Sequence, residues 1–170
     1  MDYKIEQMNG FTVIGFEKMI SEETAYRDCP AFWSEYQEKY MAPMLRRGRP
    51  ENELERAVCD HHIGEFGVCV CNDDRTFRYL IAGSYQGGSV PEGLTLFSFP
   101  ASKWAKFKAM GPMPQALQAL NTAIFTKWMP ENGDWELAVG ANIEWYSMGD
   151  MSAADYESGI WVPVKRKRAQ

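Results

Sequence analysis

The 170-residue sequence has no apolar run near 20 residues, and its start lacks the apolar core of a secretory signal. A membrane-spanning helix needs about 20 consecutive apolar residues, so the sequence predicts a protein that stays out of the membrane, in the cytoplasm. Basic residues are not in excess, because the net charge is −5 and the pI is about 5.1. Direct nucleic-acid binding is therefore not expected, since neutralising phosphates needs a basic face.

Cysteine and histidine are also scarce, with four and two residues respectively. The cysteines do not form a dense disulfide framework, which fits a reducing cytosol. The soft metal ligands that lie near one another in the sequence lack the usual C-x₂-C or H-x₃-H spacing. These are Cys59, His61, Cys69 and Cys71. We therefore expect no metal and no cofactor.

The signatures of nucleophilic catalysis are missing as well. Neither histidine lies in a recognisable nucleophile arrangement, and no G-x-S-x-G occurs. The stretch "GSYQGG" is too loose to be a phosphate-binding loop. These absences favour a binding protein over an enzyme.

Large rings are abundant, by contrast. Aromatic residues make up 14% of a chain that is 45% apolar and 24% charged, which is typical of a globular protein with one core. Six tryptophans and eight tyrosines can fill a core or line a pocket, and composition alone does not choose between these uses.

The periodicity of apolar residues predicts the order strand–helix–strand–strand, and this order occurs twice. In the first half we expect a strand at 11–19, a helix at 28–43, and strands at 65–71 and 76–84 joined by a turn at 72–75. In the second half we expect a strand at 101–110, a helix at 113–130, and strands at 141–148 and 159–165.

Prolines mark the expected ends of both helices. The first helix is expected to start at Asp28 or Cys29 and to end before Pro43, and the second to open at Pro114 and close at Pro130. One face of the second helix carries the expected apolar stripe. It consists of Leu117, Leu120, Ile124 and Trp128.

These elements predict an α+β fold of two β-α-β-β repeats about a pseudo-twofold axis, with helices on one face and a central ligand cleft. We expect a single domain over residues 1–165, with pseudo-repeats at about 1–88 and 94–165. The loop at 85–93 is the best internal boundary. The basic run "KRKR" near the end predicts a solvated basic tail at 166–170.

Glu144 is the most informative single residue, because it lies within the apolar strand "ANIEWYSM". Alternation places Glu144 and Tyr146 on one face, and Ile143 and Trp145 on the other. A buried carboxylate must be solvated, paired, protonated or matched to a ligand. The structural alternative is an edge-strand glutamate that faces water or pairs with Arg78 or Lys106.

Aromatic side chains near such a carboxylate would suit a lipophilic cation through apolar contact and cation–π attraction. Trp161 alternates against two aliphatic residues and therefore faces away from them. For each ring taken separately, packing in the core is the competing interpretation. The candidate ligand-binding rings are Trp33, Tyr36, Tyr79, Trp104, Tyr146 and Trp161.

Several stretches, in order along the chain, resemble the bacterial transcription-activator effector-binding domain, also called the GyrI-like small-molecule-binding domain. They include "FTVIGF", "PAFWSEY", "FRYLIAG", "VPEGLTLFSFPASKWAKF", "FTKWMPENGDWE", "NIEWYS" and "DYESGIWVPVK". The resemblance covers about residues 1–165. It implies two β-α-β-β units, a central pocket and a pocket glutamate that corresponds to Glu144.

The resemblance also implies a function, namely the sensing of hydrophobic, often cationic, small molecules. We expect a stand-alone effector-binding domain that acts in transcription regulation through a protein partner, since no residues remain for a helix-turn-helix. Two alternatives stay open. One is a hydrolase of reactive electrophilic small molecules, with Glu144 as general base, and the other is a protein that binds gyrase or another topoisomerase.

Overall fold

The computed structural model describes residues 1–168, and its contacts divide the chain into two compact units. The N-terminal unit is Phe11–Phe99, and the C-terminal unit joins Met1–Gly10 to the chain from Pro100 onward. Each unit contains an antiparallel sheet and helices, so the predicted α+β class is confirmed. Among the described residues, no helix is long and apolar enough to cross a membrane.

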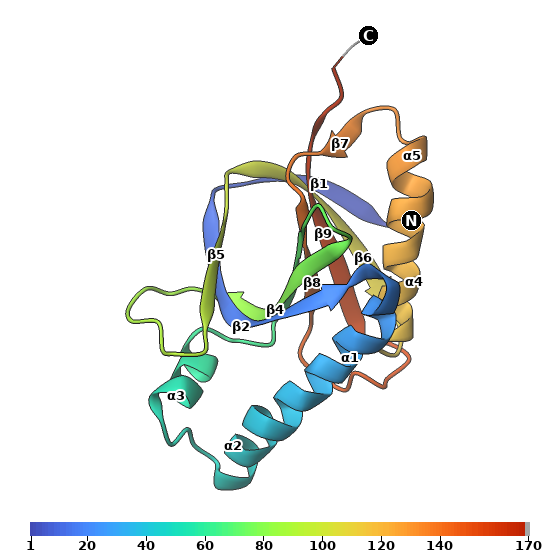
Figure 1. The fold of residues 1–170 in the computed structure, drawn as a ribbon. Helices are drawn as coiled ribbons and strands as arrows, with labels where there is room; N and C mark the ends of the chain where they lie inside the picture. The colour runs from blue at the N-terminus through green and yellow to red at the C-terminus, as the bar shows by residue number, and fades with distance from the viewer. Residues whose placement is uncertain (169–170) are drawn as a thin grey trace. The chain divides into compact units, whose positions relative to one another are not determined.

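The sheet of the N-terminal unit has the strand order β3-β4-β2-β5, and every neighbouring pair is antiparallel (Figure 1). Its strands are β2 (Phe11–Ser21), β3 (Phe66–Cys71), β4 (Thr76–Ser84) and β5 (Thr95–Phe99). Its helical segments are η1 (Glu22–Thr24), α1 (Ala25–Tyr36), η2 (Gln37–Met41), α2 (Ala42–Arg47) and α3 (Glu53–Asp60).

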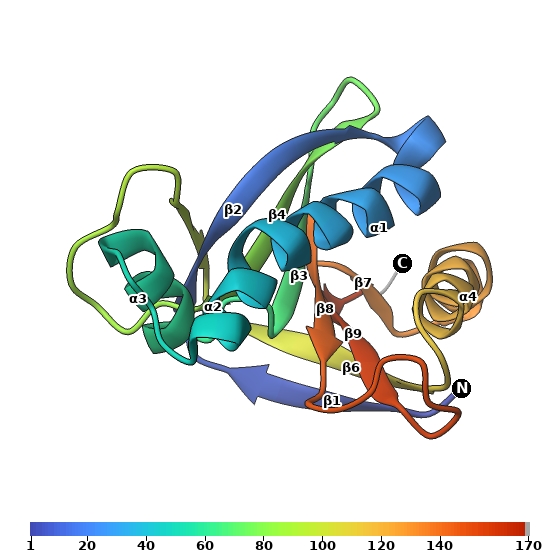
Figure 2. The ribbon, with the colours of Figure 1, turned by 90° about the horizontal axis from the view of Figure 1, so that it is seen from below.

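The core of the N-terminal unit lies between this sheet and α1, which runs along β2 and β4 (Figure 2). The alternating residues Phe77, Tyr79 and Ile81 of β4 all enter this core, as their spacing predicts. From the helix, Phe32 and Tyr36 pack against them. Burial of these rings is what fixes the helix on the sheet.

The first helix is longer than predicted at both ends. It begins at Ala25 rather than at Asp28 or Cys29, and it continues through Pro43 to Arg47. Proline normally interrupts a helix because it lacks an N–H and crowds the carbonyl four residues earlier. Here the preceding segment η2 widens to a π-helix, in which the Ala42 N–H reaches back to the Gln37 carbonyl. The wider turn accommodates the proline, so the chain stays helical.

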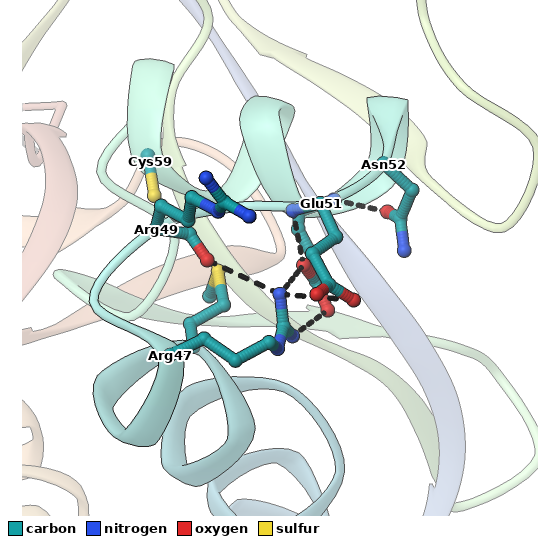
Figure 3. A network of polar contacts seen from close by, with 7 residues as sticks. Arg47, Arg49, Glu51, Asn52 and Cys59 are labelled. Carbon is teal, nitrogen blue, oxygen red and sulfur yellow. Dashed lines mark hydrogen bonds and ion pairs between the residues drawn. The ribbon is translucent and has the colours of Figure 1, made fainter.

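A polar network joins the end of α2 to the start of α3 (Figure 3). The guanidinium of Arg47 donates to both carboxylate oxygens of Glu55, at 3.0 and 2.7 Å. The same carboxylate accepts a bond from the Glu51 backbone N–H, and the Asn52 side chain caps α3. These charge-assisted bonds satisfy a buried acid and pin the turn between the helices.

The sheet of the C-terminal unit has the order β1-β6-β9-β8, again antiparallel throughout, and β7 pairs with β9 (Figure 1). Its strands are β1 (Tyr3–Met8), β6 (Ser102–Met110), β7 (Trp135–Leu137), β8 (Ala141–Tyr146) and β9 (Glu157–Arg166). Its helical segments are α4 (Gln115–Ala123), η3 (Ile124–Trp128) and α5 (Met129–Glu131).

The helix of the C-terminal unit packs on β6 and β9 (Figure 2). The four residues of the predicted apolar stripe are all buried, so that prediction is confirmed. Pro114 precedes the first helical residue as expected. The predicted end at Pro130 is one residue short, because the helix again widens to a π-turn, η3, two positions before the proline.

The two units therefore share one internal plan: a strand, a helix with a π-turn before a proline, and two further strands. Each also has an edge strand that the periodicity did not predict, β5 in the N-terminal unit and β1 in the C-terminal unit. Both edge strands pair with the strand that precedes the helix.

The basic tail predicted at 166–170 begins later than expected. Arg166 still belongs to β9, where it pairs with Trp135 of β7, lies over that ring and approaches Asp134. The Lys167 backbone N–H donates to the Asp134 carbonyl. The ladder with β7 and the cation–π contact hold these basic residues on the unit. Residues 169 and 170 lie outside the described part of the chain.

Candidate functional site

Glu144 and Tyr146 project from one face of β8, as alternation predicts. In the ladder with β9, Glu144 lies opposite Ile160 and Tyr146 lies opposite Ser158. Directly paired residues of an antiparallel ladder share a face. Ile160 in turn pairs with Phe107 of β6, whose ring meets Trp128 of the helix edge-on. The face that carries Glu144 is therefore the face on which the helix packs, and we call it the helix face.

The Tyr146 hydroxyl donates a hydrogen bond of 2.5 Å to Glu144 Oε2. Glu144 is half-buried, and Tyr146 is 8% exposed. This hydrogen bond holds the Glu144 carboxyl group in one orientation. Of the two basic residues named as alternative partners, Arg78 pairs with Glu17, and Lys106 pairs with Glu6.

Ser158 is a polar residue of this face that the sequence did not single out. Its side chain is fully buried opposite Tyr146, and its hydroxyl makes no hydrogen bond to the described residues. A buried hydroxyl without a partner lowers stability, so such groups call for an explanation. The serine reads as an ordinary strand residue in the sequence, and only the register of β8 on β9 reveals its position.

Trp161 lies on the opposite face of the sheet, which we call the outer face. It pairs with Ile143 and Lys106, and its ring stacks on Trp145 at 6.5 Å between centroids. Trp104 shares this face by register and is fully buried. Neither tryptophan is brought to Glu144 by the ladder of the C-terminal unit.

The remaining candidate rings, Trp33, Tyr36 and Tyr79, belong to the N-terminal unit. The Trp33 indole N–H donates to the Tyr79 hydroxyl at 2.7 Å, and the Tyr36 hydroxyl donates to the Ile63 carbonyl at 2.8 Å. Burial raises the pKa of the Tyr36 phenol above its usual range. Tyr36 and Tyr79 are core residues, and Trp33 packs against that core.

The cysteines and histidines are not arranged as a metal site. In the part of the chain that the structure describes, no cluster of three or more metal-ligating side chains occurs. His61 is buried, and its Nδ1 accepts a bond of 3.0 Å from the Gln86 backbone N–H. This bond ties the loop that follows β4 to the end of α3.

Two units, each with an antiparallel sheet and a helix, make up the fold that the sequence resemblance implies for an effector-binding domain. The model of the integron-associated effector binding protein family, Cass2, matches residues 4–164, so the chain belongs to this family. The resemblance found in the sequence motifs is thereby confirmed.

A curated relative is the transcriptional regulator BrlR of Pseudomonas aeruginosa. It is 29% identical over 115 residues, which cover 65% of this chain and 42% of the regulator. The chain thus matches less than half the length of that protein.

Solved structures agree with the fold. The structure of SAV2435 bound to tetraphenylphosphonium superposes with a TM-score of 0.77 at 21% identity, covering 97% of this chain and 94% of that one. A transcription regulation protein from Staphylococcus aureus MU50 gives a TM-score of 0.68 at 23% identity, covering 97% of this chain and 99% of that one. At these identities the likeness establishes the fold alone.

Proposed function

We propose that this protein binds hydrophobic, cationic small molecules and that Glu144 is the anionic anchor of the site. The observation that carries the proposal is the hydrogen bond from Tyr146 to the half-buried Glu144 carboxylate on the helix face. Placing a carboxyl group in a partly apolar strand costs solvation free energy, so its presence there indicates a charged or polar function. Held by a tyrosine and shielded from bulk water, it would attract a cation more strongly than a surface carboxylate does.

The chemistry of the guest follows from the surroundings of the carboxylate. Ile160 lies opposite Glu144 in the ladder, and the Tyr146 ring flanks it on the same face. A guest that satisfies the acid while touching these groups carries a positive charge on an apolar body. Family membership supports this assignment, as does the cationic ligand of the structural neighbour SAV2435.

The biological role that we propose is ligand-dependent transcription regulation exerted through a protein partner. The relationship to a transcriptional regulator over 42% of that protein's length supports this role. The chain has a net charge of −5, and DNA binding requires basic residues that neutralise phosphates. The charge therefore favours a protein partner over direct contact with DNA.

The proposal is tested by calorimetric titration of tetraphenylphosphonium and of the smaller neutral compound triphenylphosphine oxide. Glu144→Gln keeps the shape of the side chain and removes its charge. We expect the variant to bind the phosphonium about 10- to 100-fold more weakly and the neutral compound almost unchanged. Mass spectrometry of the recovered ligand should show it intact; turnover abolished by Glu144→Gln would replace the binding role with an enzymatic one.

Glu136→Gln is the matched control. Glu136 lies in β7 of the same unit, is about half exposed and pairs with Lys165, so it carries the same charge away from the helix face. This variant should keep its phosphonium affinity within about twofold, because exposed charges are screened. Equal losses in both glutamine variants would mean that the net charge of the protein, rather than Glu144, attracts the cation.

A further inference from the structure

The outer face of the C-terminal unit has a hollow of about 290 Å³ that the function proposed above does not use. Its lining comes from β1, β6, β8 and β9, together with residue 2 just before β1. Its lining residues include three lysines, two tryptophans and one aspartate: Lys4, Lys106, Lys108, Trp145, Trp161 and Asp2. Tyr3, Phe107 and Ser158 complete the lining. A hollow of this volume is close to the lower limit of known small-molecule sites and has room for a two-ring guest.

Gly159 lies on β9, between the two strands that carry Lys108 and Trp145. In the ladder it is flanked by Lys108 on β6 and by Trp145 on β8. A Cβ at this position would come within 2.6 Å of the Phe107 carbonyl oxygen and 3.7 Å of the Trp145 ring. Because Gly159 has no side chain, the sheet surface is open at this position, and the long side chains of Lys108 and Trp145 flank the opening.

The apolar wall consists of Trp145 and Trp161, whose rings are stacked with an interplanar angle of 14° and centroids 6.5 Å apart. Both rings remain partly exposed on a face that also carries charged residues. The ammonium of Lys106 lies over the Trp161 ring, 4.0 Å from its centroid. Flat apolar surface beside a fixed positive charge is the combination that recognises an aromatic ring bearing an acidic group.

The lysines are held by carboxylates that are not among the lining residues. Glu6 lies 3.2 Å from the ammonium groups of both Lys4 and Lys106, and Glu157 lies 2.7 Å from that of Lys108. The two lysine ammoniums beside Glu6 hold the pKa of its carboxyl below the usual range. Each ammonium has three donors, so these ion pairs leave N–H groups for a guest anion.

We propose that this hollow binds a planar aromatic anion, such as an aromatic carboxylate or sulfonate. The guest ring would lie against Trp145 and Trp161, and its acidic group would meet Lys106 and Lys108. A cationic guest is disfavoured, because the cation–π position on Trp161 is already taken by Lys106 and two further ammonium groups line the hollow. The site is separate from Glu144, which projects from the other face of the sheet.

The probes are naphthalene-2-sulfonate and the uncharged naphthalene-2-sulfonamide, titrated by calorimetry. Wild-type protein should bind the sulfonate about tenfold more tightly than the sulfonamide. Lys106→Met should lower the affinity for the sulfonate about tenfold and leave the affinity for the sulfonamide almost unchanged. Trp161→Ala should weaken both, and Glu6→Gln should strengthen sulfonate binding, because a competing carboxylate is lost.

Lys165→Met is the matched control, because Lys165 is exposed in β9 and pairs with Glu136 away from the hollow. It should leave sulfonate binding unchanged, and Lys106→Met should leave tetraphenylphosphonium binding unchanged. Circular dichroism establishes that each variant is folded. Equal affinities of wild type for the two naphthalene compounds, equal losses in Lys106→Met and Lys165→Met, or loss of sulfonate binding in Glu144→Gln would each overturn the proposal.

Discussion

The Tyr146 hydroxyl donates a hydrogen bond of 2.5 Å to the carboxyl group of Glu144, two positions away on the helix face of β8. The pair is formed within a single strand, because the pleat places residues two positions apart on the same face. The tyrosine thereby orients the acid and satisfies one of its lone pairs without adding a charge of its own. Orientation and charge are thus contributed by different residues, and they can be removed separately.

Tyr146→Phe removes the orienting bond and keeps the carboxylate. We expect tetraphenylphosphonium affinity to fall about two- to fivefold, well short of the loss in Glu144→Gln, and the free energy of unfolding to fall by about 0.5–1.5 kcal/mol. Calorimetry and urea unfolding measure the two effects. A loss in Tyr146→Phe as large as that in Glu144→Gln would show that the hydroxyl, rather than the charge, dominates binding.

Glu55→Gln tests the network between α2 and α3. The guanidinium of Arg47 and then the backbone N–H of Glu51 hold the pKa of the Glu55 carboxyl below its usual range. A lowered folded-state pKa adds stability above the unfolded-state pKa, and this stability is lost as the pH falls through the folded-state pKa. The variant should therefore be less stable than wild type at neutral pH, and the difference should shrink in acid.

Urea unfolding of both proteins from about pH 7 to about pH 3 measures this convergence. Glu53→Gln makes the same chemical change at an exposed position in the first turn of the same helix and serves as the control. A gap between wild type and Glu55→Gln that stays constant across this range would mean that packing, rather than the ion pair, accounts for the loss.

Gly159→Ala tests the origin of the hollow. The added methyl group would meet the Phe107 carbonyl oxygen at 2.6 Å, so backbone must shift, and we expect a loss of about 1–3 kcal/mol in the free energy of unfolding. The methyl group would also stand between Lys108 and Trp145, which line the hollow, so sulfonate affinity should fall while phosphonium affinity is kept. Unfolding curves and the two titrations check these outcomes; unaltered stability would contradict the close approach of β9 to β6.

Most of the architecture was predictable from periodicity where an element buries one full face. The alternation in β4 and the apolar stripe of the second helix are such cases, since Tyr79 and Ile124 are each fully buried. The strands β1, β5 and β7 were missed because they are short or lie at an edge and bury few side chains. The helix ends predicted from the prolines were wrong, because a π-turn before Pro43 and Pro130 keeps the chain helical.

Within the candidate site, alternation gave the facing of single strands correctly and could not give their register. It placed Glu144 with Tyr146, and Trp161 away from Ile160. Which residue of β9 lies opposite Glu144 depends on the pairing of two strands, and a shift by one residue would exchange the faces. The structure places Ile160 there, so Trp161 lies on the outer face instead.

The central claim is that a fixed negative charge at Glu144 selects cationic guests. Tetraphenylphosphonium and tetraphenylborate have nearly the same shape and opposite charge, so the ratio of their dissociation constants isolates the electrostatic contribution. Measured by calorimetry at one ionic strength, Glu144→Gln should shift this ratio toward the borate by at least about tenfold relative to wild type. A ratio that is the same in wild type and Glu144→Gln would contradict the account.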